Sequence, residues 1–279
     1  MRLKRLPTLI ALMALVIGLH WAQALAQSTL PVRVDRWLEL QRIAGSVTFK
    51  RGQSNQTATV GTRLESTGDT LVTGADSSAS LAVDTGIGTV QVSENTTLRV
   101  QRLESLPSGG RVTRLEILSG QARLQVRAFT DPDSELEIET PAGVSGVRGT
   151  DFGVSVRPDG TTGVATLEGK VLASAQGQSV LVDAGLQSLI VPGEPPTPAV
   201  PLREDTRLDV TFIGFVGASQ VQIRGQVDPV NLLLIGDQPQ AVDRNGQFNF
   251  QGSVTDDRPI PAVVITPLGS RQAYEIVIP

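Results

Sequence analysis

The sequence has almost none of the side chains that most often carry enzyme chemistry. It contains no cysteine, one histidine and two methionines, and these three lie at His20, Met1 and Met13. The rest of the chain therefore lacks disulfides, thiol redox chemistry, zinc sites with nitrogen or sulfur ligands, and histidine-assisted nucleophiles. We predict that the protein is not an enzyme, with no catalytic residues and no metal or cofactor site.

Positive charge and aromatic side chains are also scarce. Aspartate and glutamate (28) outnumber lysine and arginine (24), which gives a net charge of -4, and aromatic residues make up 4% of the chain. Because an acidic protein repels phosphates, we expect no nucleic-acid partner. Trp37 and Phe49 could form a sugar-binding platform, but packing beneath the first strands is the role we expect for them.

The first 26 residues have the layout of a secretory signal peptide. The first five residues carry three positive charges, residues 9–19 are an apolar run, and Ala24-Leu25-Ala26 places small residues before a cleavage point. The run is shorter than the ~20 residues that span a bilayer. We predict cleavage after Ala26 and a periplasmic or secreted protein, with a retained anchor as the alternative. Removing three basic residues changes the net charge from -4 to -7, and the mature chain should have no transmembrane segment.

Short runs with alternating apolar residues replace any helix signal in the remaining chain. The 28 glycines and 17 prolines are spread throughout and interrupt helices. Residues 121–129, 135–140 and 164–173 alternate apolar and polar side chains between turn-forming residues, which is typical of half-buried strands. We predict an all-β protein whose first domain is a short β-solenoid or a sandwich.

A proline-rich stretch divides the chain. Residues 191–201 contain five prolines, and such a composition favours an extended, semi-rigid spacer. We therefore predict a first domain at residues 27–191, a linker at 192–202 and a second domain at 203–279. The second domain shows roughly seven short strand patterns, which indicate a β-sandwich. Its Asn245-Gly246 pair favours a type I′ hairpin turn.

An ordered set of short motifs runs through the first domain. Residues 140–154 contain Val-Arg-Gly-Thr-Asp-Phe at 147–152, residues 68–84 contain a Gly-Asp, Thr-Gly, Ser-x-x-Leu block, and shorter motifs follow at 118–121, 168–171 and 184–185. In this order the motifs resemble those of the FecR family over about residues 42–190. The resemblance implies the periplasmic β-domain of a regulator that receives a signal from an outer-membrane iron-siderophore receptor and contacts a sigma factor through a cytoplasmic part.

The layout of this chain differs from that of FecR. The signal peptide leads almost directly into the FecR-like domain, so we expect no cytoplasmic sigma-binding part. The sequence therefore favours an exported interaction or scaffold module that binds an envelope protein or a cell-wall polymer. The alternative is a periplasmic signalling component that relays an extracytoplasmic cue to a membrane or sigma-factor regulatory partner. A hydrolase that uses carboxylates is a distant third possibility.

The second domain carries a different pattern. Residues 221–231 read Val-x-Ile-x-Gly-x-Val-Asp-Pro-x-Asn, and residues 242–248 read Val-Asp-x-Asn-Gly-x-Phe. This pattern resembles bacterial immunoglobulin-like modules, which implies a sandwich but no particular ligand.

Five residues of the 147–152 motif form the candidate structural or partner-contact site: Val147, Arg148, Gly149, Thr150 and Phe152. Burying a guanidinium without partners is costly, so we expect Arg148 to clamp backbone carbonyls or a carboxylate, with Asp151 or Asp84 as the candidate partner. A contact with another protein is the alternative. We expect Gly149 to permit a close backbone approach and Phe152 to lie in the core.

Acidic residues in turns are the last candidates for a site. Asp131, Asp133 and Glu135 form one group, and Asp256 and Asp257 form another. Neither group shows a full calcium-loop pattern. We expect solvated turns, with calcium binding or a glycosidase pair left open.

Overall fold

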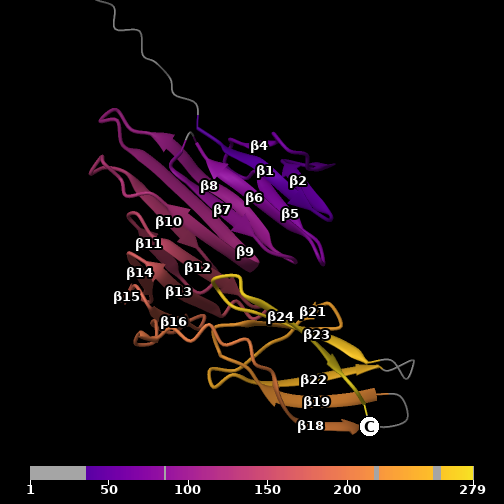
Figure 1. Cartoon of the computed structure of the whole chain (residues 1–279). Helices are drawn as coiled ribbons and strands as arrows, with labels where there is room; N and C mark the ends of the chain where they lie inside the picture. Colours follow the sequence, from indigo (N-terminus) through magenta and orange to yellow (C-terminus); the bar gives the residue numbers. More distant parts are fainter. Residues whose placement is uncertain (1–35, 85, 217–219, 254–258, 279) are drawn as a thin grey trace, which may run out of the picture. The chain divides into compact units, whose positions relative to one another are not determined.

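The protein is described by a computed structural model, which places residues 36–84, 86–216, 220–253 and 259–278. The described residues form strands and turns without helices (Figure 1). The all-β prediction is therefore confirmed. The predicted signal peptide lies outside the described residues. Across those residues, nothing folds into a helix of the length and hydropathy needed to cross a membrane.

Residues 36–201 form two sheets that share one long strand, β9 (Arg111–Val126), in a continuous set of 17 strands. Sheet A runs in the order β4 (Arg63–Leu64), β1 (Leu38–Ala44), β6 (Ser78–Val83), β7 (Gly88–Val92), β9, β12 (Asp151–Val156), β13 (Thr162–Glu168), β16 (Leu186–Ile190) and β17 (Val200–Pro201). Sheet B runs in the order β3 (Ser54–Thr57), β2 (Val47–Arg51), β5 (Thr70–Thr73), β8 (Thr97–Ser105), β9, β10 (Glu135–Glu139), β11 (Val144–Val147), β14 (Lys170–Ala175) and β15 (Gln178–Asp183).

The inward side chains of sheets A and B meet in a single hydrophobic core. Leu81 and Val154 of sheet A and Leu115 and Ile138 of sheet B are fully buried in it. Alternation along each strand produces this core, because every second side chain points to the same face. Apart from the parallel pair β9–β10, the strands pair antiparallel. The strands of successive coils in a parallel β-solenoid pair parallel to one another, whereas the strands here pair antiparallel. Of the two expected architectures, the structure is therefore a sandwich.

A glycine lets β9 belong to both sheets. Residues up to Ser119 pair with β8 in sheet B, and residues from Gly120 onward pair with β12 in sheet A. Gly120 has a φ of 91°, and a Cβ there would lie 2.2 Å from Oγ1 of Thr96. Thr96 Oγ1 in turn accepts a hydrogen bond of 3.0 Å from the backbone N–H of Gln121. The side chain of Thr96 thus satisfies the backbone where the strand changes sheet.

The proline-rich stretch is hydrogen-bonded to the first sandwich. Val200 and Pro201 form β17, which pairs with β16, and the N–H of Thr197 donates to the Leu189 carbonyl at 2.9 Å. Proline is compatible with this place because an edge strand needs no donor on its outer side. The extended, semi-rigid spacer expected for this stretch stays a prediction. The predicted domain boundaries stay a prediction.

Residues 209–276 form a second, smaller sandwich. Sheet C contains β18 (Asp209–Phe215), β19 (Gln220–Gln226) and β22 (Gln247–Ser253), and sheet D contains β21 (Gln238–Pro239), β20 (Leu232–Ile235), β23 (Ile260–Ile265) and β24 (Arg271–Ile276). All pairs are antiparallel, and the two sheets enclose their own core. The immunoglobulin-like assignment of this module stays a prediction.

The turn before β22 differs from the expected type. Gly246 has a φ of 86°, but Asn245 is absent from the residues with positive φ. A type I′ turn needs a positive φ at both central residues. The carboxylate of Asp243 instead accepts the backbone N–H groups of Asn245 and Gln247, each at 2.8 Å, which replaces the predicted geometry by a side-chain-stabilised turn.

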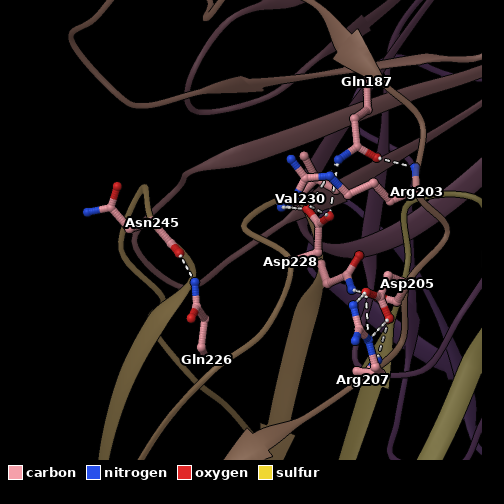
Figure 2. Close-up of polar contacts among 9 residues, drawn as sticks. Gln187, Arg203, Asp205, Arg207, Gln226, Asp228, Val230 and Asn245 are labelled. Atoms are coloured by element: carbon pink, nitrogen blue, oxygen red, sulfur yellow. Dashed lines mark hydrogen bonds and ion pairs between the residues drawn. The ribbon is translucent and has the colours of Figure 1, made fainter.

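Small residues on the outer face of β12 and β13 bring the second sandwich into close contact. A Cβ on Gly153 would lie 1.8 Å from the Pro267 carbonyl oxygen, and one on Gly163 would lie 2.4 Å from the Val230 carbonyl oxygen. Polar contacts extend this interface around Asp228 (Figure 2), which accepts the amide of Gln187 at 3.2 Å. The core face of β12 carries large apolar residues, so both of its faces are covered.

Candidate functional site

The 147–152 motif is a corner where the chain passes from β11 in sheet B to β12 in sheet A. We call residues 147–152 the motif corner. Val147 is 5% exposed at the end of β11, and Phe152 is fully buried in β12. The expectation that Phe152 lies in the core is confirmed. These two apolar side chains anchor the corner on either side of its polar residues.

Gly149 and Thr150 bring the corner against the end of β9. Gly149 has a φ of 85°, and a Cβ there would lie 2.4 Å from the Cα of Ala128. The predicted close backbone approach is confirmed. Thr150 and Val126 exchange two backbone hydrogen bonds of 2.9 Å, and Thr150 Oγ1 donates to the Lys170 carbonyl at 3.1 Å. The backbone of the corner is therefore fixed by both β9 and β14.

Asp151 is held by neighbours on β9. Its carboxylate oxygens accept hydrogen bonds from Arg123 at 2.8 and 2.7 Å and from the Gln125 amide at 3.0 Å. Burial alone would raise the pKa of Asp151, but these hydrogen bonds outweigh it and lower the pKa below its ordinary value. Asp151 therefore stays ionised near neutral pH and serves as a fixed structural anion.

Arg148 contacts a backbone carbonyl, which is one form of the expected clamp, but its side chain is exposed rather than buried. Its Nη2 atom donates to the backbone carbonyl of Pro132. The two suggested carboxylates have other partners: Asp151 pairs with Arg123, and Asp84 pairs with Arg36 at 2.7 Å. Because Arg148 follows the inward-facing Val147, strand alternation directs its side chain outward.

The motif corner borders a hollow of about 500 Å³. We call it the corner hollow. Its lining residues come from four segments: Gly86, Gly88, Thr89, Gln125, Val126, Arg127, Ala128, Gly149, Thr150, Asp151 and Glu168. Arg127 is exposed, and its guanidinium lies near Gly86, where a Cβ would be 3.5 Å from Nη1. Among the described residues, the Arg127 side chain has neither a hydrogen-bond nor an ion-pair partner.

Two exposed arginines therefore flank the corner without a carboxylate partner among the described residues. Arg127 and Arg148 each immediately precede one of the two residues, Ala128 and Gly149, that approach each other. Guanidinium groups present planar sets of donors that suit carboxylates. This arrangement can bind an acidic group of another molecule, which is the contact role left open for Arg148.

Sequence reasoning missed two buried arginines. Arg36 is 6% exposed, and its guanidinium donates to Asp84, to Thr113 Oγ1 at 2.7 Å and to backbone carbonyls. Arg157 is 2% exposed and lies 3.8 Å from Asp159. Burial lowers the pKa of Arg157 more than the nearby Asp159 and Asp243 raise it. Arg36 directly precedes an alternating strand. This position is the sequence signal that could have identified Arg36 as a buried arginine that links several chain segments.

The other candidate residues have ordinary structural surroundings. Asp131 accepts the N–H of Asp133 at 2.9 Å within a turn, while Asp256 and Asp257 lie outside the described residues. The part of the chain that the structure describes has no cluster of three or more acidic, histidine or cysteine residues suited to a metal ion. Phe49 is buried in the core, and Trp37 packs under the guanidinium of Arg63 at 4.2 Å.

Comparisons with known proteins give one family match. The family described as FecR protein matches residues 69–172, which include the motif corner. No curated protein matches the chain. Two crystal structures of a candidate anti-sigma factor from Parabacteroides distasonis, at 2.50 and 1.65 Å resolution, each show 16% identity over 41% of this chain and 51% of theirs, with TM-scores of 0.34 and 0.35. A polysaccharide lyase shows 10% identity over 90% of this chain and 41% of its own, with a TM-score of 0.20. The chain thus spans about half or less of these solved structures.

Proposed function

We propose that this protein is a non-catalytic signalling component of the bacterial cell envelope, which relays an extracytoplasmic cue to a membrane or sigma-factor regulatory partner. The observation that carries this proposal is the FecR match over residues 69–172. It supports the signalling alternative over the scaffold role that the sequence favoured. The signal-peptide pattern in the first 26 residues supports a periplasmic or secreted location.

The motif corner supplies the contact surface in this proposal. Arg127 and Arg148 are exposed beside the corner hollow, and neither has a carboxylate partner among the described residues. The one carboxylate at the centre of the corner, Asp151, is already paired with Arg123. An acidic patch on a partner therefore meets two available guanidinium groups, and complementary charge increases both the rate and the specificity of association.

The rigid framework under the corner suits a relay rather than catalysis. Thr150 is 2% exposed and bonded to two strands, so that the backbone that carries the flanking arginines is held in place before binding. A backbone that is already ordered loses less conformational entropy on association than a mobile one. No step of bond making or breaking is assigned to these side chains.

A genetic experiment in the native host tests the proposal. We expect deletion of the gene to change the transcript levels of a defined gene set, and we expect the intact gene to restore them. The double variant Arg127→Ala/Arg148→Ala should fail to restore them, whereas Arg102→Ala should succeed, because Arg102 is an exposed arginine on β8 that pairs only with Glu104 among the described residues. Unchanged transcripts after deletion, or full restoration by the double variant, would contradict the proposal.

A further inference from the structure

The outer face of sheet C has an unusual chemical composition. Its side chains are mostly amides, and they are Gln220, Gln222, Gln226, Gln247, Asn249 and Gln251. The register pairs them across β19 and β22, with Gln222 opposite Gln251 and Gln226 opposite Gln247. Directly opposed residues of an antiparallel pair lie on the same face. The face is therefore a regular array of uncharged groups that both donate and accept hydrogen bonds.

One aromatic ring and one guanidinium complete this face. Phe212 of β18 is opposite Arg224 of β19, and the guanidinium lies 4.4 Å from the centroid of the ring. Phe212 is 39% exposed, and within the described residues the Arg224 guanidinium has no hydrogen-bond or ion-pair partner. A hollow of about 630 Å³ lies beside the two side chains.

We infer that the outer face of sheet C, which we call the amide face, binds a neutral polysaccharide. Sugar hydroxyls are donors and acceptors at once, and amide side chains match both functions. The apolar C–H face of a sugar ring packs against an aromatic ring such as Phe212, and the planar donors of Arg224 hydrogen-bond adjacent hydroxyls. Outward side chains repeat at a constant interval along each strand, which suits a polymer of repeating units.

The local charge favours an uncharged ligand. Of the residues that the structure describes, Arg224 is the only positive side chain on the amide face, and Asp209 and Asp243 lie at its rim. A polyanion would meet two carboxylates for one guanidinium. A polycation would meet the guanidinium of Arg224, and the carboxylate of Asp243 already accepts two backbone N–H groups. A protein partner is disfavoured too, because protein interfaces have apolar cores and this face offers one exposed ring.

Part of the amide array is already ordered. Gln222 donates to Oδ1 of Asn249 at 2.9 Å, and Gln226 donates to the Asn245 carbonyl at 2.8 Å (Figure 2). These bonds hold long side chains against the sheet and reduce the entropy that a ligand must remove on binding. The second nitrogen-bound hydrogen and the carbonyl oxygen of each glutamine stay available for hydroxyl groups.

Native affinity electrophoresis of the full protein tests this inference. The gels contain mixed-linkage β-glucan, galactomannan or dextran as neutral polymers, and alginate as an anionic one. We expect at least one neutral polymer to retard the protein and alginate to leave it unretarded. Phe212→Ala and Arg224→Gln should each weaken the retardation at least tenfold.

Two matched variants control for indirect effects. Phe215→Ala removes a ring on the same strand as Phe212 that is more exposed than Phe212. The Phe215 ring faces the inner side of sheet C, because Phe215 is opposite the core residue Val221. Gln272→Ala removes an exposed amide of sheet D. Both should bind like the wild type, and unfolding midpoints confirm that each variant is folded.

The inference is overturned if none of the three neutral polymers retards the protein, if only alginate does, or if Phe212→Ala and Arg224→Gln both bind normally. If Phe212→Ala does not fold, Arg224→Gln alone decides. Loss of a dimer in Phe212→Ala, measured by sedimentation without any glycan effect, would assign the amide face to self-association and likewise reject the inference.

Discussion

The side-chain amide of Gln121 donates a 2.6 Å hydrogen bond to the backbone carbonyl of Pro267, 146 residues further along the chain. Gln121 lies where β9 enters sheet A, and Pro267 follows β23 of the second sandwich. Arg271 adds a second link, because its Nε atom lies 2.8 Å from a carboxylate oxygen of Glu94. The two sandwiches therefore share hydrogen bonds that a flexible tether would not maintain.

We expect Gly153→Ala to loosen this interface. A Cβ at position 153 would lie 1.8 Å from the Pro267 carbonyl oxygen, so the backbone of the second sandwich has to move. Overpacking of this kind costs about 1–3 kcal/mol. The measurement is the rate of trypsin cleavage after Arg203 or Arg207, which should increase when the two sandwiches separate.

Gly146→Ala is the matched control for this variant. Gly146 also lies in a strand of the first domain, and a Cβ there would meet no atom within 4 Å. Its cleavage rate should equal that of the wild type. Equal rates for all three proteins would show that the close approach at Gly153 does not hold the sandwiches together.

Arg148→Ala should leave the stability almost unchanged. The exposed side chain contacts one carbonyl group, and surface substitutions of this kind stay within about 0.5 kcal/mol. Arg36→Ala should instead cost about 3–5 kcal/mol, because it removes the nearer cation from the buried carboxylate of Asp84 and leaves only the more distant Arg111 at 3.8 Å. Urea unfolding of both variants measures the difference, and a large loss for Arg148→Ala would support the clamp hypothesis.

Acid should destabilise the first sandwich through Asp69. Its carboxylate is 1% exposed and accepts hydrogen bonds from Arg51 at 2.8 and 2.7 Å and from the N–H groups of Glu65 and Ser66. Burial alone would raise the pKa of Asp69, but these bonds outweigh it and lower the pKa below 3.8. A lowered pKa in the folded state means that the unfolded state binds the proton more tightly.

The sign of the pH effect follows from this difference. The contribution of Asp69 is complete above the unfolded-state pKa of about 3.9, and it is lost as the pH falls through the lower folded-state pKa. Urea midpoints between pH 2 and pH 6 should therefore decline less steeply on acidification for Asp69→Asn than for the wild type. Asp237→Asn, at an exposed turn position, should retain the slope of the wild type, and equal slopes for both variants would reject this role of Asp69.

Local patterns were sufficient to predict the strands and much of the core. Alternation at residues 121–129 predicts the part of β9 that enters sheet A, and Phe152 is buried as expected. Val147 and Phe152 both point inward although they are five positions apart, an odd number. A continuous strand would place them on opposite faces. This mismatch already required a break between them, and Gly149 supplies it.

The partners of charged residues could not be predicted in the same way. Arg123 pairs with Asp151 because β9 and β12 are adjacent in a particular register, across 28 positions of sequence. Register between distant strands depends on the packing of the complete sheet, and a shift by one residue would exchange the faces. The pairing of the proline-rich stretch with β16 could not be predicted for a related reason, since it depends on an edge that exists only in the folded sheet.

Gly149→Ala should destabilise the first sandwich through backbone strain and through a steric clash. A variant at a second glycine, Gly177, separates the two effects. Gly149 and Gly177 both have positive φ values, 85° and 70°, but a Cβ at 177 would meet no atom within 4 Å, whereas one at 149 would lie 2.4 Å from the Cα of Ala128. Backbone strain alone costs about 1–3 kcal/mol, and this is the whole loss expected for Gly177→Ala. For Gly149→Ala the clash adds about 1–3 kcal/mol, because the motif corner must withdraw from β9. Urea unfolding measures both losses. Similar losses of stability for the two variants would mean that the motif corner adapts to the added methyl group without a further cost. The close approach to β9 would then not be what fixes the positions of Arg127 and Arg148.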